Sequence, residues 1–219
     1  MALRAKQQTI YSHKSKCSNS KCDCPEFQDT GMNMCKCMHS NIQHIDLTID
    51  RPHYIFVLYG SGDESTGPHG STHAMAIEMI DTMTKMNIGP ILFSSLDDMI
   101  GVDIMKRGKL LLIATSTRGK GENPYSAHYW TRNKEVPKSY GNIPYIIWAI
   151  GDSEYQHHYA FGEQVRKRLE KNNFEKNLSR DYPLGMIVLD VAREENIESS
   201  KKSICDLLIK YEKTLQLQE

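Results

Sequence analysis

Five short apolar runs, each followed by a helix-like segment, constrain the fold of this chain more than any other feature. The runs are YIFVLY (54–59), ILFSS (91–95), KLLLIAT (109–115), YIIWAI (145–150) and GMIVLDV (185–191). Helical patterns are expected at 73–87, 96–107, 157–171 and 198–215, with a further segment at 125–134. Several runs are apolar throughout, which is typical of parallel strands covered on both faces. With right-handed crossovers, the repetition predicts a doubly wound α/β sandwich of five strands.

Composition and charge exclude several classes of protein. The 219 residues allow one ordinary domain and a small extra module. Lys+Arg and Asp+Glu are both 27, so the chain lacks the basic surplus of a nucleic-acid binder. Its apolar runs are too short to cross a bilayer, and its first 16 residues lack the apolar core of a secretory signal. We therefore expect a soluble cytoplasmic protein that binds neither nucleic acid nor membranes.

Unusual residues follow the first, third and fourth predicted strands, at the edge of a doubly wound sheet where ligands bind. The first loop ends in Gly70, Ser71 and Thr72, directly before a predicted helix. Free N–H groups and hydroxyls at a helix start suit a phosphate. Simple N-capping by Ser71 or Thr72 is the alternative interpretation.

The second and third loops carry features that suit a flat aromatic ligand. In ATSTRGKGENPYSA (114–127), Gly119 and Gly121 would let the backbone approach such a ligand closely. In AIGDSEYQHHYAFG (149–162), Gly151 allows a turn, and Tyr155 lies where a ring could stack. An ordinary flexible loop, and packing or solvation at a helix start, are the alternatives.

Taken together, these loops resemble the flavodoxin-like FMN domain of the diflavin reductases. That group includes cytochrome P450 reductase, the nitric oxide synthase reductase region and methionine synthase reductase. STRGKGENPYSA is similar to the family's S-T-(Y/F)-G-x-G-(D/E)-x-P-x-N-(A/G) loop, and GDSEYQHHYAFGEQVRKRLEK to its next helix start. YGS…GSTHAMA is similar to the family's phosphate loop. The resemblance implies a flavodoxin-like three-layer sandwich over 51–219, with strand order 2-1-3-4-5.

The resemblance also implies roles for particular residues. Ser61 and the segment 70–72 would line the FMN phosphate, and 117–121 would run along the isoalloxazine ring. Tyr155 would stack on the outer face of the ring, and Asp152 falls at the matching Asp/Asn position. The candidate cofactor-binding residues are Ser61, Gly70, Ser71, Thr72, Thr117, Arg118, Gly119, Gly121, Gly151, Asp152, Tyr155 and His157.

Two departures from the family pattern oppose tight FMN binding. The family's inner aromatic residue is Arg118 here, whose guanidinium can still stack on a ring and would favour a reduced, anionic flavin. The phosphate loop is longer by about six residues, and it includes Asp63 and Glu64, which would repel a phosphate. His69 and His73 replace a threonine and a glutamate of the family, so their charge would make binding depend on pH.

Five of the six cysteines lie between residues 17 and 37, which in a reducing compartment indicates metal ligation. Four ligands would form a closed tetrahedral Zn²⁺ site, and the metal would fold the segment 1–50. An iron–sulfur cluster and unligated thiols are the alternatives. Cys205, on the last predicted helix, is expected in the core. The candidate metal ligands are Cys17, Cys22, Cys24, Cys35, Cys37, His39 and His44.

The sequence therefore predicts a single-flavin electron-transfer protein with an N-terminal metal-binding module. Because the chain ends where the resemblance ends, we expect electrons to pass from a separate NAD(P)H-dependent flavin reductase to a separate acceptor protein. The competing hypothesis is a flavodoxin-fold protein that has lost FMN and serves as a zinc-containing interaction or regulatory module. A flavin-dependent quinone reductase fits the loops less well.

Overall fold

The computed structural model describes residues 54–62, 70–100, 108–133, 143–175, 185–193 and 195–216. Strands and helices alternate along this part of the chain. Their order is β1 (Tyr54–Gly60), α1 (Gly70–Lys85), β2 (Ile91–Ser95), β3 (Gly108–Ser116), the 3-10 helix η4 (Tyr125–Ala127), α2 (His128–Arg132), β4 (Tyr145–Gly151), α4 (Ala160–Glu175), β5 (Gly185–Asp190) and α5 (Glu195–Gln216).

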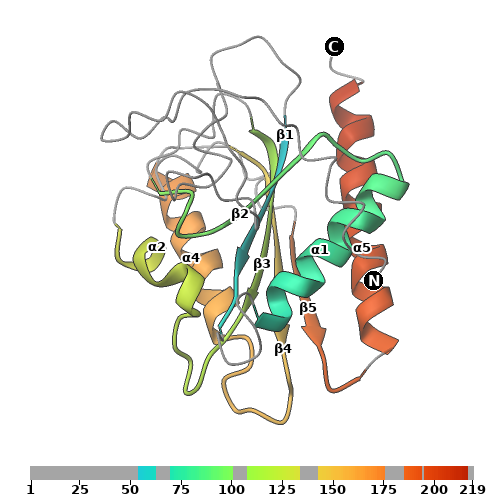
Figure 1. Cartoon of the computed structure of the whole chain (residues 1–219). Coiled ribbons are helices and arrows are strands. Elements are labelled where there is room, and N and C mark those ends of the chain that lie inside the picture. The colour runs from blue at the N-terminus through green and yellow to red at the C-terminus, as the bar shows by residue number, and fades with distance from the viewer. Residues whose placement is uncertain are drawn as a thin grey trace, which may run out of the picture.

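The strands form one parallel sheet in the order β2-β1-β3-β4-β5, which confirms the predicted fold and strand order. Helices α2 and α4 cover one face of the sheet, and α1 and α5 cover the other (Figure 1). The strand order switches between β1 and β3, so the loops that follow these two strands diverge toward opposite faces. The carboxyl ends of all the strands meet at one edge, the lower one in Figure 1.

Two apolar cores explain why the central strands are apolar throughout. Along β1, Phe56 and Leu58 enter the core on the α2–α4 face, whereas Ile55 and Val57 enter the core on the α1–α5 face. Successive side chains of a strand point to opposite faces, and here both faces are covered. The edge strand β5 is less covered, and Val188 is 47% exposed.

Several helix boundaries differ from the prediction, and local polar bonds account for two of the differences. The first helix begins at Gly70 rather than 73, and the helix predicted from 157 begins at Ala160. Residues 152–159 form turns instead, and the Ala160 N–H donates to the His157 carbonyl at 3.1 Å. The predicted helix at 96–107 is a turn over 96–100, where Asp98 bonds to Ser95, and the rest lies outside the described residues.

Some predictions fall on parts of the chain that the structure does not describe. The metal ligands Cys17, Cys22, Cys24, Cys35, Cys37, His39 and His44 lie outside the described residues, as do Asp63, Glu64 and His69 of the lengthened loop. The division of the chain near residue 50 also stays a prediction. Cys205 is 1% exposed in the α1–α5 core, as predicted. Among the described helices, none combines the length and apolarity needed to cross a bilayer.

Candidate functional site

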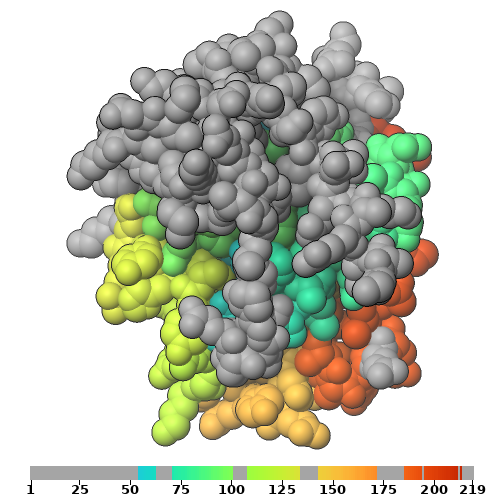
Figure 2. Space-filling view, viewed as in Figure 1, coloured from blue at the N-terminus to red at the C-terminus, as the bar shows by residue number. Residues whose placement is uncertain are grey.

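The predicted site residues within the described chain gather at the carboxyl edge of the sheet, on the loops after β1, β3 and β4. Figure 2 shows the segments after β3 and β4 next to each other at the lower edge of the molecule, in yellow-green and orange. A Cβ on Gly62 would lie 3.9 Å from the Cβ of Arg118, so the loop after β1 contacts the loop after β3. The structure thus brings together segments that are far apart in the sequence.

The loop after β1 is tied down by Ser126. The Ser61 N–H donates to Ser126 Oγ at 2.7 Å, and Ser126 Oγ donates back to the Ser61 carbonyl at 3.2 Å. Gly60 leaves no room for a side chain, since a Cβ there would lie 2.9 Å from Thr115 Oγ1. The chain therefore leaves β1 in a defined direction, and its first loop residue is held against the loop after β3.

Several buried hydroxyls have no hydrogen-bond partner within the described part of the chain, and two of them lie in the loop after β1 and the first turn of the helix that follows it: Ser61 Oγ and Thr72 Oγ1. Ser61 is 5% exposed and Thr72 is 0% exposed. Thr72 lies in the first turn of α1 and its hydroxyl makes no capping bond, so the N-cap interpretation is wrong for this residue. The first four N–H groups of an α-helix have no partner inside the helix. These groups and hydroxyls together form a set of donors that suits an anion.

The helix start also contains Gly70, Ser71 and His73. Gly70 is the first residue of α1, and Ser71 in the same turn is exposed. The His73 ring packs against Tyr59 at 4.7 Å and Phe93 at 5.3 Å between ring centroids. His73 thus contacts aromatic side chains of β1 and β2. Burial, together with the nearby Asp98 carboxylate, raises the pKa of Tyr59 far above its usual range.

The loop after β3 forms a tight turn that depends on two glycines. The N–H groups of Gly121 and Glu122 both donate to the Arg118 carbonyl, at 3.1 and 2.7 Å. Gly119 has a φ of 49° and Gly121 a φ of 98°, in the left-handed region that favours glycine. The predicted Gly119 and Gly121 therefore shape a loop whose backbone is accessible to a ligand.

Arg118 stacks on Tyr125. The family that the sequence resembles has an aromatic residue at the position of Arg118. The Cζ atom of Arg118 lies 4.0 Å from the centroid of the Tyr125 ring. Both side chains are exposed, Tyr125 at 49%. The two side chains therefore present a flat, positively charged surface beside Gly62.

The loop after β4 requires Gly151 and exposes Tyr155. A Cβ on Gly151 would lie 2.3 Å from the His158 carbonyl oxygen, so only glycine fits there. Asp152 accepts a hydrogen bond from the Glu154 N–H at 2.9 Å, which forms a local turn rather than capping α4. The Tyr155 ring is 66% exposed, which leaves it available to a planar ligand.

The loops after β3 and β4 are bonded to each other at their bases. Thr117 Oγ1 accepts a hydrogen bond from the Phe161 N–H at 3.0 Å, and the Gln164 side chain donates to the Gly121 carbonyl at 3.2 Å. A Cβ on Gly121 would lie 3.8 Å from His157 Cβ. The predicted residues Thr117, Gly121 and His157 are thus neighbours, and His157 is exposed at the rim.

Four residues that support the site were not among those selected from the sequence: Tyr125, Ser126, Gln164 and Asp190. Asp190, at the end of β5, accepts hydrogen bonds from the Ser153 and Ala192 N–H groups at 3.0 and 3.2 Å. Its hydrogen bonds with Ser153 lower the pKa of the Asp190 carboxyl. An acidic residue directly after an apolar strand was the available signal for Asp190. Tyr125 and Ser126 lie inside the quoted STRGKGENPYSA motif, but their contacts depend on the folded loop.

The sequence and the fold are similar to those of known flavodoxin-type proteins. The sequence model of the family described as Flavodoxin matches residues 48–200. The sulfite reductase (NADPH) flavoprotein alpha-component of Zymomonas mobilis is 29% identical over 156 residues, which cover 67% of this chain and 23% of that protein. The protein of the same name from Shigella dysenteriae is 35% identical over 75 residues, which cover 33% of this chain and 12% of that protein. The matches thus span less than a quarter of the length of these relatives.

Solved flavodoxins share the fold at low sequence identity. A flavodoxin of Pseudomonas aeruginosa superposes with a TM-score of 0.50 at 20% identity, over 70% of this chain and 97% of that one. Flavodoxin 1 of Bacillus cereus superposes with a TM-score of 0.51 at 14% identity, over 71% of this chain and 97% of that one.

Proposed function

The chain belongs to the flavodoxin family of FMN-binding electron-transfer domains, and from this premise we propose that it binds FMN at the edge formed by the three loops. The bound FMN would carry electrons from a separate NAD(P)H-dependent flavin reductase to a separate acceptor protein. Its loop motifs resemble those of the diflavin reductase group, and we propose that the chain belongs to this branch of the family.

The observation that carries this proposal is the pair of buried, unpartnered hydroxyls of Ser61 and Thr72. Leaving a buried hydroxyl without a partner costs about 1–3 kcal/mol, so two such groups at the same edge of the sheet favour a bound group that accepts hydrogen bonds there. A phosphate group beside the first turn of α1 would accept hydrogen bonds from both hydroxyls and from the free backbone N–H groups. The donor set therefore fits the phosphate end of FMN.

The remaining loop residues fit the ring of the cofactor. The turn at 118–122 exposes backbone groups next to the Arg118 guanidinium, and the exposed Tyr155 offers an aromatic face. When bound, FMN supplies the redox chemistry, while the protein supplies binding, orientation and electrostatics. In this proposal the turn at 118–122 contacts the ring edge, and Arg118 and Tyr155 contact its faces.

The names of the relatives support the proposal that this chain exchanges electrons with partner proteins. Their name describes the flavoprotein component of an NADPH-dependent sulfite reductase. We propose that the reductase partner of this chain is likewise an NAD(P)H-dependent flavoprotein. The acceptor partner is proposed only as a protein that takes electrons from FMN.

Replacing Thr72 with valine tests the phosphate site. Thr72→Val keeps the shape of the side chain and removes the unpartnered hydroxyl, so FMN affinity should fall about tenfold, the effect of one hydrogen bond to a charged group. Riboflavin, which lacks the phosphate, should bind the variant and the unmodified protein equally. Flavin fluorescence quenching measures both affinities.

Thr84→Val is the matched control. Thr84 lies on the same helix, and its exposed hydroxyl donates to the Ile80 carbonyl at 2.8 Å, far along the helix from the first turn. FMN affinity should be unchanged in this variant. If the full-length protein binds neither FMN nor riboflavin, the proposal fails and the hypothesis of a fold that has lost its cofactor gains support.

A zinc site in the N-terminal segment is a second proposal, which rests on the sequence pattern of Cys17, Cys22, Cys24, Cys35, Cys37, His39 and His44. Metal analysis of the full-length protein should find about one zinc ion per chain, the content of a single tetrahedral site. Cys35→Ser should lower the zinc content, whereas Cys205→Ala, in the core of the domain, should not. Iron together with labile sulfide would indicate an iron–sulfur cluster instead.

A further inference from the structure

The stack of Arg118 on Tyr125 is held in place by the fold of the loop after β3. The guanidinium carbon lies 4.0 Å from the ring centroid, which is the distance of a close cation–π contact. Tyr125 begins η4, directly after the buried Pro124, so its backbone is anchored. The adjacent Ser126 bonds to Ser61 on the loop after β1. Tyr125 is therefore a fixed support for a long side chain that would otherwise sample many rotamers.

The positive charge of Arg118 is not neutralised by an ion pair within the described part of the chain. Glu122 is the acidic residue of the same turn, and it meets Arg118 through backbone bonds. Stacking on Tyr125 covers one face of the guanidinium and leaves its charge in place. A ligand beside the loop thus meets a flat group that is charged and already oriented.

Resting on the proposed FMN site, we propose that Tyr125 is a positioning residue that holds Arg118 flat, and that this pair makes the site bind reduced flavin more tightly than oxidised flavin. Two electrons and one proton convert the neutral oxidised ring into a ring with one negative charge. In the cell an NAD(P)H-dependent flavin reductase would supply the electrons. Only the reduced ring carries a charge opposite to that of Arg118, so the contact favours that state.

The preference can be measured as a ratio of two dissociation constants. The full-length protein is titrated at neutral pH with oxidised FMN and, anaerobically, with FMN that dithionite has reduced. Arg118→Met should lower the preference for reduced FMN about tenfold, the effect of losing one charge contact near the surface. A tenfold loss of this preference corresponds to a fall of about 30 mV in the two-electron midpoint potential of the bound flavin.

Variants of Tyr125 separate positioning from packing. Tyr125→Leu should lower the preference in the same direction by a smaller factor, and Tyr125→Phe, which keeps an aromatic face, should retain it. The double variant Arg118→Met/Tyr125→Leu should match Arg118→Met alone, because Tyr125 acts through Arg118. Both side chains are exposed, so these variants are expected to fold, and circular dichroism checks this.

Lys167→Met is the charge control, since Lys167 is an exposed cation on α4, outside the turn at 118–122. Its preference for reduced FMN should equal that of the unmodified protein. An equal loss in Lys167→Met and Arg118→Met, or additive effects in the double variant, would overturn the inference while FMN binding stands. Failure of both forms of FMN to bind the unmodified protein would overturn the proposed function as well.

Discussion

Position 151 shows how a single residue determines the shape of a loop in this site. Gly151 ends β4, and the chain then turns so tightly that the His158 carbonyl lies over it. The ring of His158 also bonds to the Tyr155 carbonyl, at 2.5 Å between Nδ1 and oxygen. A side chain at position 151 would push the turn away and displace Tyr155 from the edge of the site.

Gly151→Ala should lower the free energy of unfolding by about 2 kcal/mol, because its Cβ would lie 2.3 Å from the His158 oxygen. Gly62→Ala is the control, since a Cβ there meets its nearest atoms at 3.8 Å. That change should stay within about 0.5 kcal/mol. Urea denaturation compares the two variants, and an equal effect would show that the β4 loop relaxes around the added methyl group.

At some single residues the sequence pattern allows more than one role. The spacing of Gly70, Ser71 and Thr72 did not distinguish a phosphate site from an N-cap. The structure excludes the cap for Thr72, whose buried hydroxyl makes no capping bond, and the phosphate site stays a proposal. Similarly, Arg118 could be identified as unusual from the motif, but its support by Tyr125 depends on the tight turn between them.

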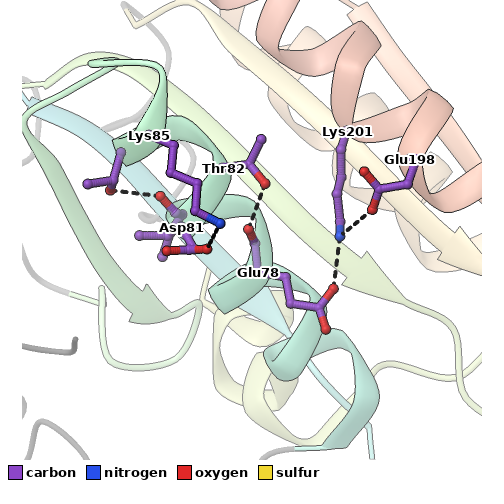
Figure 3. A network of polar contacts seen from close by, with 8 residues as sticks. Glu78, Asp81, Thr82, Lys85, Glu198 and Lys201 are labelled. Carbon is purple, nitrogen blue, oxygen red and sulfur yellow. Dashed lines mark hydrogen bonds and ion pairs between the residues drawn. The ribbon is translucent and has the colours of Figure 1, made fainter. Parts of the chain in front are cut away.

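At the scale of elements, a buried lysine links two helices on the same face of the sheet. Lys201 of α5 has a side chain that is 8% exposed, and its ammonium bonds to Glu78 of α1 at 2.8 Å and to Glu198 at 3.0 Å. Figure 3 shows Lys201 reaching from α5 to the Glu78 carboxylate. Because Glu78 lies two turns after the start of α1, this bond helps to hold the helix that begins at the proposed phosphate site.

Lys201→Met should lower the free energy of unfolding by about 1 kcal/mol. The loss is modest because Glu78 and Glu198 are 61% and 82% exposed and stay hydrated without their partner. Lys202→Met, which removes an exposed pair with Asp206, should change stability by less than about 0.5 kcal/mol. Thermal and urea unfolding measure both. Equal losses would mean that the link between α1 and α5 adds nothing.

The contribution of Lys201 should also depend on pH. Burial by itself lowers the pKa of Lys201, but its hydrogen bonds with Glu78 and Glu198 outweigh that effect and raise it above the ordinary value of 10.5. A raised pKa in the folded state stabilises the protein fully below the ordinary value and loses this effect as the pH rises past it. The stability difference between the unmodified protein and Lys201→Met should therefore be constant near neutral pH and shrink in strong alkali.

At the scale of the whole molecule, the proposed ligand would contact three loops that belong to one cooperative sheet. Ser61 bonds to Ser126, and Thr117 bonds to Phe161, so the loops after β1, β3 and β4 are already connected. A ligand that binds across them stabilises the folded domain as a unit. This makes global unfolding a readout of binding that requires no electron-transfer partner.

FMN at one hundred times its dissociation constant should raise the free energy of unfolding by about 2.7 kcal/mol. The same concentration of riboflavin should raise it less, because riboflavin lacks the group that Ser61 and Thr72 would bind. Differential scanning fluorimetry over a range of FMN concentrations measures the effect as a rising melting temperature. A melting temperature that does not respond to FMN at any concentration would contradict a site on the folded domain.

The sequence by itself determined the layered sheet, because burial of a strand on both faces requires apolar residues throughout and leaves a local pattern. The sequence also located the three loops, because glycines and polar residues directly follow the first, third and fourth apolar runs. Helix starts were less predictable, because bonds such as that between Ala160 and His157 compete with helical pairing.

Only the tertiary structure decided which side chains meet. The unpartnered state of Ser61 and Thr72, the stack of Arg118 on Tyr125 and the support of the β4 loop by Asp190 all depend on contacts in the folded chain. Such contacts follow from the packing of strands and helices distant in sequence, and a one-dimensional pattern does not record the distances between them. The sequence thus predicted the kind of ligand and named Ser61, Thr72 and Arg118, whereas the burial of the two hydroxyls and the stacking of Arg118 on Tyr125 became visible only in the fold.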